Sequence, residues 1–367
     1  MRKIIHVITT IEMGGAEKQL LVLAGQQVSN GHDVTVFYLK GRPELKEDFE
    51  SLGVKVSSQL ANTNSIFSFF RLSSILHNNP NAICHAHLPQ SELMAALAKG
   101  GKHKLVVTRH NAEQFWPRRN RLVSKLLSRL VAARADRVIA ISRAVADFLY
   151  ESGEISTHTT VDVVLYGSAP DRDSETQPFF PETSSVETRI GAIGRLVDQK
   201  NYPTLLKAFS LVVRRNPSFH LYIIGDGPLK QELQSLADLL EIGPAVTWLG
   251  RTKKIPQFLS SIDLFVLPSK YEGFGLVLLE AMAAGTPILA ANNSAIPEVL
   301  GENYPGLFAT YNSEELANKI KEFPRIKGQY EEILKKRLIL FEPHVMYQQI
   351  EDIYQSIYSH KRFKIRD

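Results

Sequence analysis

Cysteine is almost absent from this chain of 367 residues, because Cys84 is its only one. A single thiol excludes an intramolecular disulfide, so we expect a protein of a reducing compartment, the cytoplasm. Long apolar runs are absent too: no stretch reaches the roughly 18 uncharged apolar residues of a membrane span. The N-terminal apolar run contains threonines and ends at Glu12, so it is too short for a signal-peptide core and predicts a first β-strand.

Several functional motifs are also missing. Gly14 and Gly15 follow the first predicted strand without the G-x-G-x-x-G spacing, which argues against a standard dinucleotide site. No compact cluster of carboxylates follows a predicted strand, and the nearest candidate, Asp-Arg-Asp at 171–173, lies in a segment without periodicity, so we expect no metal site. No nucleic-acid-binding motif accompanies the basic residues, so we expect no nucleic-acid partner.

What the chain does have is an alternation of short β-branched runs with longer helical patterns, which predicts an α/β fold with parallel sheets. With 44% hydrophobic and 22% charged residues, a chain of this length suggests two globular domains. The predicted strands are 4–9, 34–39, 82–86, 104–108, 137–141 and 161–165 in the first half, and 189–195, 220–225, 246–250, 263–268 and 286–290 in the second.

Residues 169–187 separate the two halves. They are rich in Pro, Ser, Thr and acidic residues and lack periodicity, which is typical of a linker. We therefore expect two Rossmann-like, doubly wound domains, 1–168 and 188–340, with ligands in a central cleft at the carboxyl ends of their strands. Residues 341–367 predict a last amphipathic helix with a basic tail.

The loops at those strand ends combine glycine with positive charge. Gly14 and Gly15 precede a helix whose exposed N-terminus is an anion site, although a tight strand-to-helix turn explains them equally well. The loop "GRLVDQKN" supplies Arg195 and Lys200, two cations able to face a diphosphate, although surface cations of this kind are commonly solvated. Gly225 begins "GDGP", a turn that glycine permits without side-chain clash.

The stretch "YEGFGLVLLE" places two carboxylates around a glycine-containing loop. Gly273 and Gly275 leave backbone amides open to phosphate oxygens, and a helix from Leu276 points its positive end at the same place. Glu280 lies about one turn inside this helix, where a carboxylate can accept hydrogen bonds from two sugar hydroxyls. Glu272 precedes the helix, and we expect the two acids to bracket a nucleotide sugar from its two ends.

These segments resemble the retaining glycosyltransferases of the GT-B fold, family four, also called glycosyltransferase group 1. The resemblance rests on "SKYEGFGLVLLEAMAAGTP", where Glu272 and Glu280 fit the E-x7-E pattern, with "GRLVDQKN" and "GDGP" upstream. "GGAE", "HAHLP" and "TRHN" fit the family's first domain, so the resemblance spans nearly the whole chain. It implies that the helix of 341–367 crosses back to the first domain.

The resemblance also implies roles at the matching positions. Arg195 and Lys200 would clamp the donor diphosphate and stabilise the charge of the leaving nucleoside diphosphate. Glu272 would bind hydroxyls of the donor sugar, and His110 would lie near the anomeric carbon and the attacking hydroxyl. The other donor-binding positions would be Gly14, Gly15, Gly225, Arg251, Gly273, Phe274, Gly275, Leu276 and, for the ribose, Glu280.

In this family the anomeric configuration is retained, and the leaving phosphate takes the acceptor's proton, so neither a metal nor another cofactor is required. The donor would be a nucleotide-diphosphate sugar, with a UDP sugar favoured, and the acceptor a saccharide, lipid-linked in surface polysaccharide or glycoconjugate assembly. Two departures from the family pattern affect substrate pockets. Ser294 stands where glycines are usual, and Tyr166 stands where an Asn is common.

Residues 95–150 carry twelve Lys and Arg but three acidic residues, whereas the whole chain has a net charge of only +5. Leucines recur there at helical spacing, each preceded by a basic residue: Leu122, Leu126 and Leu130. One interpretation is a core-packing helix with a solvated basic face. The other is peripheral attachment of residues 115–137 to an anionic membrane on the cytoplasmic side, with Phe115 and Trp116 at the edge of the contact.

His85 and His87 belong to one predicted strand. We expect them to point to opposite faces of it, which would exclude a metal site shared by the two. His85 would then be a packed or hydrogen-bonded histidine, and His87 would lie near the acceptor.

Three functions are compatible with these observations. The preferred one is a glycosyltransferase. The second is a GT-B-fold nucleotide-sugar epimerase, which would release a free sugar or an isomer without an acceptor. The third is a catalytically silent subunit that binds a nucleotide sugar, against which the intact set of Arg195, Lys200, Glu272 and Glu280 argues.

Overall fold

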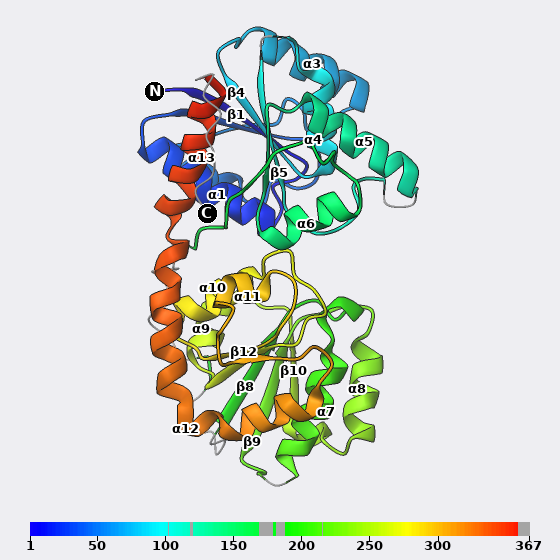
Figure 1. Ribbon diagram of the computed structural model, residues 1–367, viewed down its shortest axis with the longest axis vertical. Helices are drawn as coiled ribbons and strands as arrows, with labels where there is room; N and C mark the ends of the chain where they lie inside the picture. Colours follow the sequence, from blue (N-terminus) through cyan, green and yellow to red (C-terminus); the bar gives the residue numbers. More distant parts are fainter. Residues whose placement is uncertain (102, 118–119, 169–178, 181–187, 215, 359–367) are drawn as a thin grey trace. The chain divides into compact units, whose positions relative to one another are not determined.

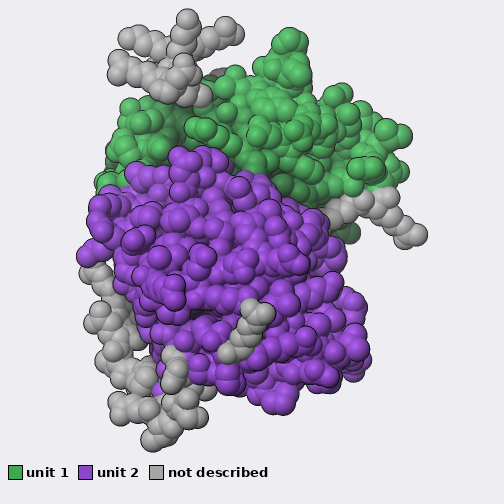
Figure 2. Space-filling view, turned by 60° about the horizontal axis from the view of Figure 1, so that its bottom comes forward, with its two compact units in different colours: residues 1–167, 341–367 green, residues 168–340 purple. Residues whose placement is uncertain are grey.

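The protein is described by a computed structural model (Figure 1), which covers residues 1–101, 103–117, 120–168, 179–180, 188–214 and 216–358. The chain divides into unit 1, which comprises Met1–Gly167 and Phe341–Asp367, and unit 2, which comprises Ser168–Leu340 (Figure 2). The C-terminal segment thus belongs to the unit formed by the N-terminal half. The expected linker of 169–187, except for Phe179 and Phe180, and the basic tail beyond 358 lie outside the described residues.

Unit 1 is built on a seven-stranded sheet with the order β3-β2-β1-β4-β5-β6-β7, in which every pairing is parallel. Its strands are β1 (Lys3–Ile8), β2 (Asp33–Tyr38), β3 (Lys55–Ser57), β4 (Ile83–His87), β5 (Lys104–Arg109), β6 (Arg137–Ala140) and β7 (Val161–Val163). Its α-helices are α1 (Gly15–Ser29), α2 (Lys46–Ser51), α3 (Ser65–His77), α4 (Pro89–Ala98), α5 (Arg121–Arg134), α6 (Arg143–Glu151) and α13 (Pro343–Tyr358).

Unit 2 has a six-stranded parallel sheet with the order β10-β9-β8-β11-β12-β13. Its strands are β8 (Thr188–Ile193), β9 (Phe219–Ile224), β10 (Val246–Gly250), β11 (Leu264–Leu267), β12 (Ile288–Ala291) and β13 (Leu307–Phe308). Its helices are η2 (Asp198–Lys200), α7 (Tyr202–Val213), α8 (Lys230–Leu239), η3 (Gly243–Ala245), α9 (Ile255–Ser260), α10 (Leu276–Ala283), α11 (Ile296–Leu300) and α12 (Ser313–Leu338), and η4 (Ile339–Phe341) ends at the unit boundary.

The predicted strands are all present, each within two residues of its expected ends, and two short strands, β3 and β13, were not predicted. Strands of this kind are near-continuous apolar runs because helices cover both faces of a parallel sheet. No α-helix among the described residues is long and apolar enough to cross a membrane.

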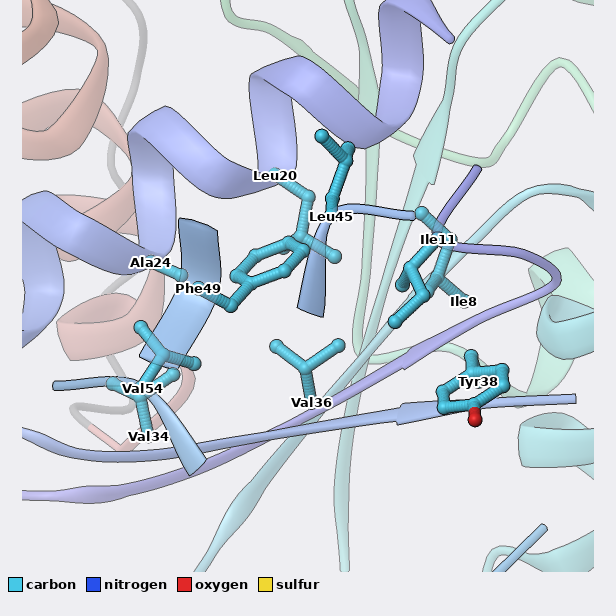
Figure 3. Close-up of a cluster of buried hydrophobic side chains, with 10 residues drawn as sticks. All are labelled: Ile8, Ile11, Leu20, Ala24, Val34, Val36, Tyr38, Leu45, Phe49 and Val54. Carbon is cyan, nitrogen blue, oxygen red and sulfur yellow. The ribbon is translucent and has the colours of Figure 1, made fainter. Parts of the chain in front are cut away.

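A buried cluster in unit 1 fixes α1 and α2 on the sheet beside β1 and β2 (Figure 3). It consists of Ile8, Ile11, Leu20, Ala24, Val34, Val36, Tyr38, Leu45, Phe49 and Val54. Burying one aliphatic or phenyl side chain contributes about 1.5–3 kcal/mol, so this contact anchors α1 firmly. It therefore also fixes the loop between β1 and α1 at the carboxyl edge of the sheet.

The strand order of each sheet reverses once at its centre, between β1 and β4 in unit 1 and between β8 and β11 in unit 2. In doubly wound sheets, ligands bind outside the carboxyl ends of the two strands at such a switch point. In unit 2, the loops of Arg195 and of Glu272 follow these two strands. In unit 1, the Gly14 loop follows β1 and His87 ends β4.

Candidate functional site

Two loops of unit 2 meet at its switch point and are held together by direct contacts. Lys200 Nζ lies 2.6 Å from Glu272 Oε1. The Gln199 side-chain amide donates to the carbonyl of Tyr271 at 3.0 Å, and the backbone amide of Lys270 donates to the carbonyl of Gln199 at 2.8 Å. The loop after β8 and the loop after β11 are therefore fixed to each other by contacts of the chain itself.

Glu272 is buried at the centre of this contact, with 6% of its surface exposed. Its Oε1 accepts a second hydrogen bond from the Ser269 hydroxyl at 2.7 Å. The sequence predicted separate ligands for the two charges, the donor sugar for Glu272 and the diphosphate for Lys200. The structure joins them in one ion pair, which gives the buried carboxylate a counter-charge.

Ser294 has an unforeseen part in holding this loop. Its hydroxyl accepts a hydrogen bond from the backbone amide of Glu272 at 2.8 Å and donates to Asn293 Oδ1 at 2.9 Å. Ser294 has a φ of +46°, a left-handed conformation that glycine adopts more readily. Where the family pattern usually has glycine, the Ser294 side chain therefore secures the backbone of Glu272.

Arg195 lies on the same loop as Lys200, but it is exposed. No ion pair between described residues involves its guanidinium, whereas Lys200 pairs with Glu272 and Lys270 pairs with Asp198. Arg195 is thus an accessible positive charge at this edge. Arg251, expected beside the nucleotide base, is also exposed and lies 4.0 Å from Asp226 Oδ2, a distance typical of a weak surface pair.

Glycines of "GDGP" pack against the backbone that carries Arg195. A Cβ on Gly225 would overlap the carbonyl oxygen of Gly194, and one on Gly227 would lie 2.5 Å from the carbonyl oxygen of Leu196. The Leu196 amide in turn donates to the carbonyl of Asp226 at 3.0 Å. These glycines are required by close backbone packing, which places the Arg195 loop.

The N-terminus of α10 opens at the same edge. Gly275 is its N-cap residue, with a φ of +87°. Because glycine has no side chain that could accept hydrogen bonds from the first amides of α10, Gly275 does not cap them. Phe274 is buried, with 2% exposure, and Gly273, Leu276 and Glu280 are half-buried. Glu280 lies in the second turn of α10, as predicted from its spacing.

In unit 1, the N-terminus of α1 is occupied by a carboxylate of the chain itself. Gly14 is the N-cap residue, and a Cβ there would overlap Glu17 Oε2. Glu17 is 8% exposed, and its Oε1 accepts a hydrogen bond from the Thr10 hydroxyl at 2.6 Å. A carboxylate in the first turn stabilises a helix as an external anion would. A diphosphate at Gly14 and Gly15 would therefore have to displace Glu17, the acidic residue of "GGAE".

His85 and His87 lie on the same face of β4, with ring centroids 4.2 Å apart, so the expectation of opposite faces is wrong. Residues two apart along a strand share a face because the side-chain period is two. Together with His6 of β1, they have ring nitrogens within 4.8 Å of one another, a spacing that a metal could use. A metal would nevertheless have to replace existing hydrogen bonds at these nitrogens.

Those bonds form a chain through the interior of unit 1. His6 Nε2 lies 2.8 Å from Gln27 Oε1, and His6 Nδ1 lies 3.0 Å from His87 Nε2. His87 Nδ1 lies 3.1 Å from His110 Nε2, and His110 Nδ1 is bonded to the Tyr166 hydroxyl. His110, predicted beside the anomeric carbon, thus has both ring nitrogens engaged. His87 is only 2% exposed, so direct contact with an acceptor is not available to it.

Burial keeps these rings neutral. Desolvation lowers the pKa of His6 to about 4 and the pKa of His110 to about 3. It lowers the pKa values of His85 and His87 well below the ordinary value, with smaller contributions from the neighbouring histidines. Near neutral pH, His110 can therefore accept or donate a hydrogen bond but carries no positive charge.

The basic helix α5 packs on the core, as one interpretation expected, but its leucines are exposed and do not form the packing face. Leu122 is 75% exposed, Leu126 65% and Leu130 38%. The buried face of α5 consists of Ser124, Ser128, Val131 and Ala132. Phe115, predicted at a membrane edge, is also buried, with Arg109 over its ring at 4.5 Å, whereas Trp116 is 45% exposed. Arg118, Arg119 and the Asp-Arg-Asp of 171–173 lie outside the described residues.

Next to Trp116 lies an apolar groove of about 520 Å³ between α3 and α4. Its lining includes Phe69, Leu93, Met94 and Leu97, together with Lys40. Ile66 and Phe70 of α3, which also line it, and the adjacent Phe67 are each more than 60% exposed. Because α4 contacts both α3 and α5, the apolar groups of the three helices lie on neighbouring elements (Figure 1).

Comparisons with known proteins agree on one family. The family model of the glycosyl transferases group 1 matches residues 173–337, and that of glycosyltransferase family 4 matches residues 13–166. An uncharacterized glycosyltransferase of Haemophilus influenzae is 24% identical over 324 residues, which is 86% of this chain and 88% of that protein.

A second relative is the N-acetylgalactosamine-N,N'-diacetylbacillosaminyl-diphospho-undecaprenol 4-alpha-N-acetylgalactosaminyltransferase of Campylobacter jejuni, 27% identical over 241 residues, or 65% of this chain and 62% of that one. Among solved structures, Anabaena HepE in complex with UDP and glucose has a TM-score of 0.78 at 21% identity, over 97% of this chain and all of that one. The fold is thus GT-B, and the two family models together account for both units. The chain belongs to the family 4, group 1 glycosyltransferases.

Proposed function

We propose that this protein transfers a sugar from a nucleotide-diphosphate sugar to a saccharide acceptor, with retention of anomeric configuration and without a metal. The observation that carries the proposal is the Lys200–Glu272 pair at the switch point of unit 2, with exposed Arg195 on the same loop. The negative charge of a bound diphosphate can pair directly with the Arg195 guanidinium. It would also draw Lys200 partly away from Glu272, leaving the carboxylate to accept hydrogen bonds from sugar hydroxyls.

A UDP sugar is the favoured donor. The N-terminus of α10 adds the positive end of a helix dipole at the same edge, which suits a phosphate group. Anabaena HepE, which shares the fold, is known in complexes with UDP and with UDP-glucose. Glu280, half-buried in the second turn of α10, is the group we assign to the ribose hydroxyls.

The transfer step requires no group beyond these. The acceptor hydroxyl oxygen forms a bond to the anomeric carbon on the face that the diphosphate leaves, and the bond from that carbon to the diphosphate oxygen breaks. The hydroxyl proton passes to the leaving phosphate. Arg195 and Lys200 stabilise the negative charge that builds up on the diphosphate, which is the largest electrostatic demand of the step.

For the acceptor we propose a lipid-linked saccharide whose hydrocarbon chain lies in the α3–α4 groove. Residues 58–134 carry eleven Lys and Arg against two acids, Glu92 and Glu113, and Glu92 is buried. Exposed apolar side chains among positive charges suit a lipid with an anionic head group. The Campylobacter relative is named for an acceptor on diphospho-undecaprenol, which combines these two features.

Release of nucleoside diphosphate from UDP, GDP and ADP sugars, measured with and without saccharide acceptors, tests the proposal. We expect acceptor-dependent release of UDP and a product whose anomeric configuration matches that of the donor. An isomerised sugar formed without an acceptor would identify an epimerase, and binding without turnover would identify a silent subunit. Activity should persist in EDTA, and complete loss that a divalent ion restores would exclude the metal-free mechanism.

A further inference from the structure

The hydrogen bonds inside unit 1 have a direction that follows from the atoms involved. The Gln27 side-chain amide donates through Nε2 to the Tyr354 hydroxyl at 3.3 Å, so its oxygen faces His6 Nε2 at 2.8 Å. An amide oxygen can only accept, so His6 must carry its proton on Nε2. Because a neutral imidazole has one donor and one acceptor nitrogen, Nδ1 of His6 is then an acceptor.

The same rule fixes every following ring. His87 must donate from Nε2 to His6, which leaves its Nδ1 to accept from His110 Nε2. His110 is left with an unprotonated Nδ1, and Tyr166 donates its hydroxyl proton to that nitrogen. In these three rings, one choice at Gln27 therefore determines all the proton positions.

A side branch follows the same logic. The Tyr354 hydroxyl accepts from Gln27 and can donate to His85 Nδ1 at 2.7 Å. His85 Nε2 then donates to Thr108 Oγ1 at 2.7 Å. A rotation of the Gln27 amide by half a turn would reverse each bond of both branches, so the rings cannot change their protonation one at a time.

We propose that Gln27, His6 and His87 are positioning residues that hold His110 as a neutral ring with its proton on Nε2 and an open lone pair on Nδ1. This rests on the proposed function and deepens it, because it assigns the half-buried His110 the role of accepting a hydrogen bond from a hydroxyl, from that of Tyr166 in the structure and from a sugar hydroxyl that takes its place. His110 is thus not a proton donor to the substrate. The chain also explains why Tyr166 replaces the usual Asn: its hydroxyl reaches His110 Nδ1.

Nitrogen NMR of the ¹⁵N-histidine-labelled protein tests the arrangement independently of activity. We expect His6, His85, His87 and His110 each to show a protonated Nε2 and an unprotonated Nδ1, unchanged between about pH 5 and pH 8. The exposed His158 serves as the reference ring. A proton on Nδ1 of any of the four, an imidazolium at neutral pH, or signals that move when EDTA removes a bound metal would overturn the proposal.

The variant Gln27→Leu removes the acceptor oxygen at the start of the chain. A proton on His6 Nε2 then has no acceptor, so we expect His6 to carry its proton on Nδ1 and to donate from there to His87. His87 and His110 then carry their protons on Nδ1 in the same way. We expect the His110 proton to move from Nε2 to Nδ1, although position 27 lies on α1 and makes no hydrogen bond to His110 in the part of the chain that the structure describes. Gln26→Leu, the matched change one residue away on a half-buried position, should leave all four rings as they are.

The variant Gln27→Glu keeps an oxygen at His6 Nε2 and should preserve the proton on Nε2 of His110. It therefore distinguishes the loss of the hydrogen-bond acceptor from a general disturbance of core packing. If Gln27→Leu leaves the His110 signals unchanged in a folded protein, the chain does not control this ring. With an active enzyme, Gln27→Leu should also lower kcat/KM about tenfold, the value of one hydrogen bond. A parent without transferase activity would refute the proposed function while the NMR result still decides the positioning.

Discussion

The two units share one architecture but differ in the chemistry at their switch points. In unit 2, the loops after β8 and β11 present a cation, Arg195, beside an ion pair of Lys200 with Glu272. In unit 1, the corresponding edge, after β1 and β4, has a neutral chain of histidines that ends at His110. The same doubly wound sheet thus supports a charged site in one unit and a hydrogen-bonding site in the other, because function depends on the side chains placed at the edge.

The difference extends to where each unit keeps its strongest charges. In unit 1, Arg109 is 4% exposed and lies between two buried carboxylates behind the edge, with Nε 3.1 Å from Glu92 Oε2 and Nη1 3.8 Å from Glu154 Oε2. The Glu154 carboxylate also accepts the backbone amide of Phe115 at 2.6 Å. These charged groups hold the segment that leads into α5, and they are themselves buried. We therefore infer that charge serves structure in unit 1 and chemistry in unit 2.

The strongest test of this contrast removes the buried cation of unit 1. Arg109→Met leaves Glu92 and Glu154 buried without their partner, and loss of one member of a buried pair costs about 3–5 kcal/mol. We expect this loss in the free energy of unfolding, measured by urea denaturation at about pH 8, above the pKa of about 7 of Glu92. Arg214→Met, which breaks the exposed pair with Glu241, should cost less than about 1 kcal/mol. Equal losses in the two variants would show that the Arg109 cluster is not a buried network.

In unit 2, the same kind of change should affect turnover first. Arg195→Met should lower kcat about 10² or more, because a preorganised charge stabiliser is lost, and should leave the stability unchanged because Arg195 is exposed. Lys200→Met should lower kcat similarly and also destabilise the protein, because Glu272 loses its partner. Initial rates and urea unfolding of both variants, with Arg214→Met as control, decide the point. A folded Arg195→Met enzyme with unchanged kcat would remove Arg195 from the proposed clamp.

A smaller effect concerns the pH dependence of unit 1. Burial raises the pKa of Glu92 to about 7, although Arg109 acts in the opposite direction. Between the ordinary pKa of 4.5 and about 7, the folded protein thus holds a proton that the unfolded chain has released, so stability falls as pH rises through this window. Glu92→Gln should abolish that slope in urea unfolding at a series of pH values. A parent whose stability rises over the same window would contradict the assignment.

Much of the fold was predictable from the sequence, because β-branched runs and crossover helices repeat along the chain. The strands β3 and β13 escaped prediction because runs of three and two residues are too short to show a period. The motif glycines and charges were found for a similar reason. They lie in single loops that follow single strands, and a loop's position in a doubly wound sheet follows from strand order.

Contacts between distant segments were not predictable. The Lys200–Glu272 pair joins residues 72 apart, and the chain from Gln27 to Tyr354 joins residues 327 apart. The buried face of α5 was predicted wrongly for a different reason. Its leucines gave the stronger periodic signal, but Ser124 and Ser128 pack inward. Their hydroxyls bond the carbonyl of Phe115 and the carboxylate of Glu154. Periodicity identifies the apolar face of a helix. Which face is buried also depends on the polar groups elsewhere in the fold that the other face can bond.

The last prediction concerns the exposed face of α5, where the expected free-energy change is smallest. If the acceptor is held at a membrane, anionic vesicles should bind the protein, neutral vesicles should bind it weakly, and high salt should release it. A Lys or Arg near an anionic surface contributes about 1 kcal/mol, so Arg121→Gln with Lys125→Gln should weaken sedimentation with anionic vesicles by about 2 kcal/mol, or roughly thirtyfold.

Leu122→Ser with Leu126→Ser should weaken vesicle binding without changing the charge, because these side chains are 75% and 65% exposed and have little to lose in the fold. Leu239→Ser, at a position 79% exposed on α8 of unit 2, is the matched control and should bind as the parent does. Both double variants should keep their turnover with a water-soluble acceptor, since neither touches Arg195 or Glu272. If the parent ignores anionic vesicles, or if all variants sediment equally, the α5 face is merely solvated and the acceptor reaches the enzyme from solution.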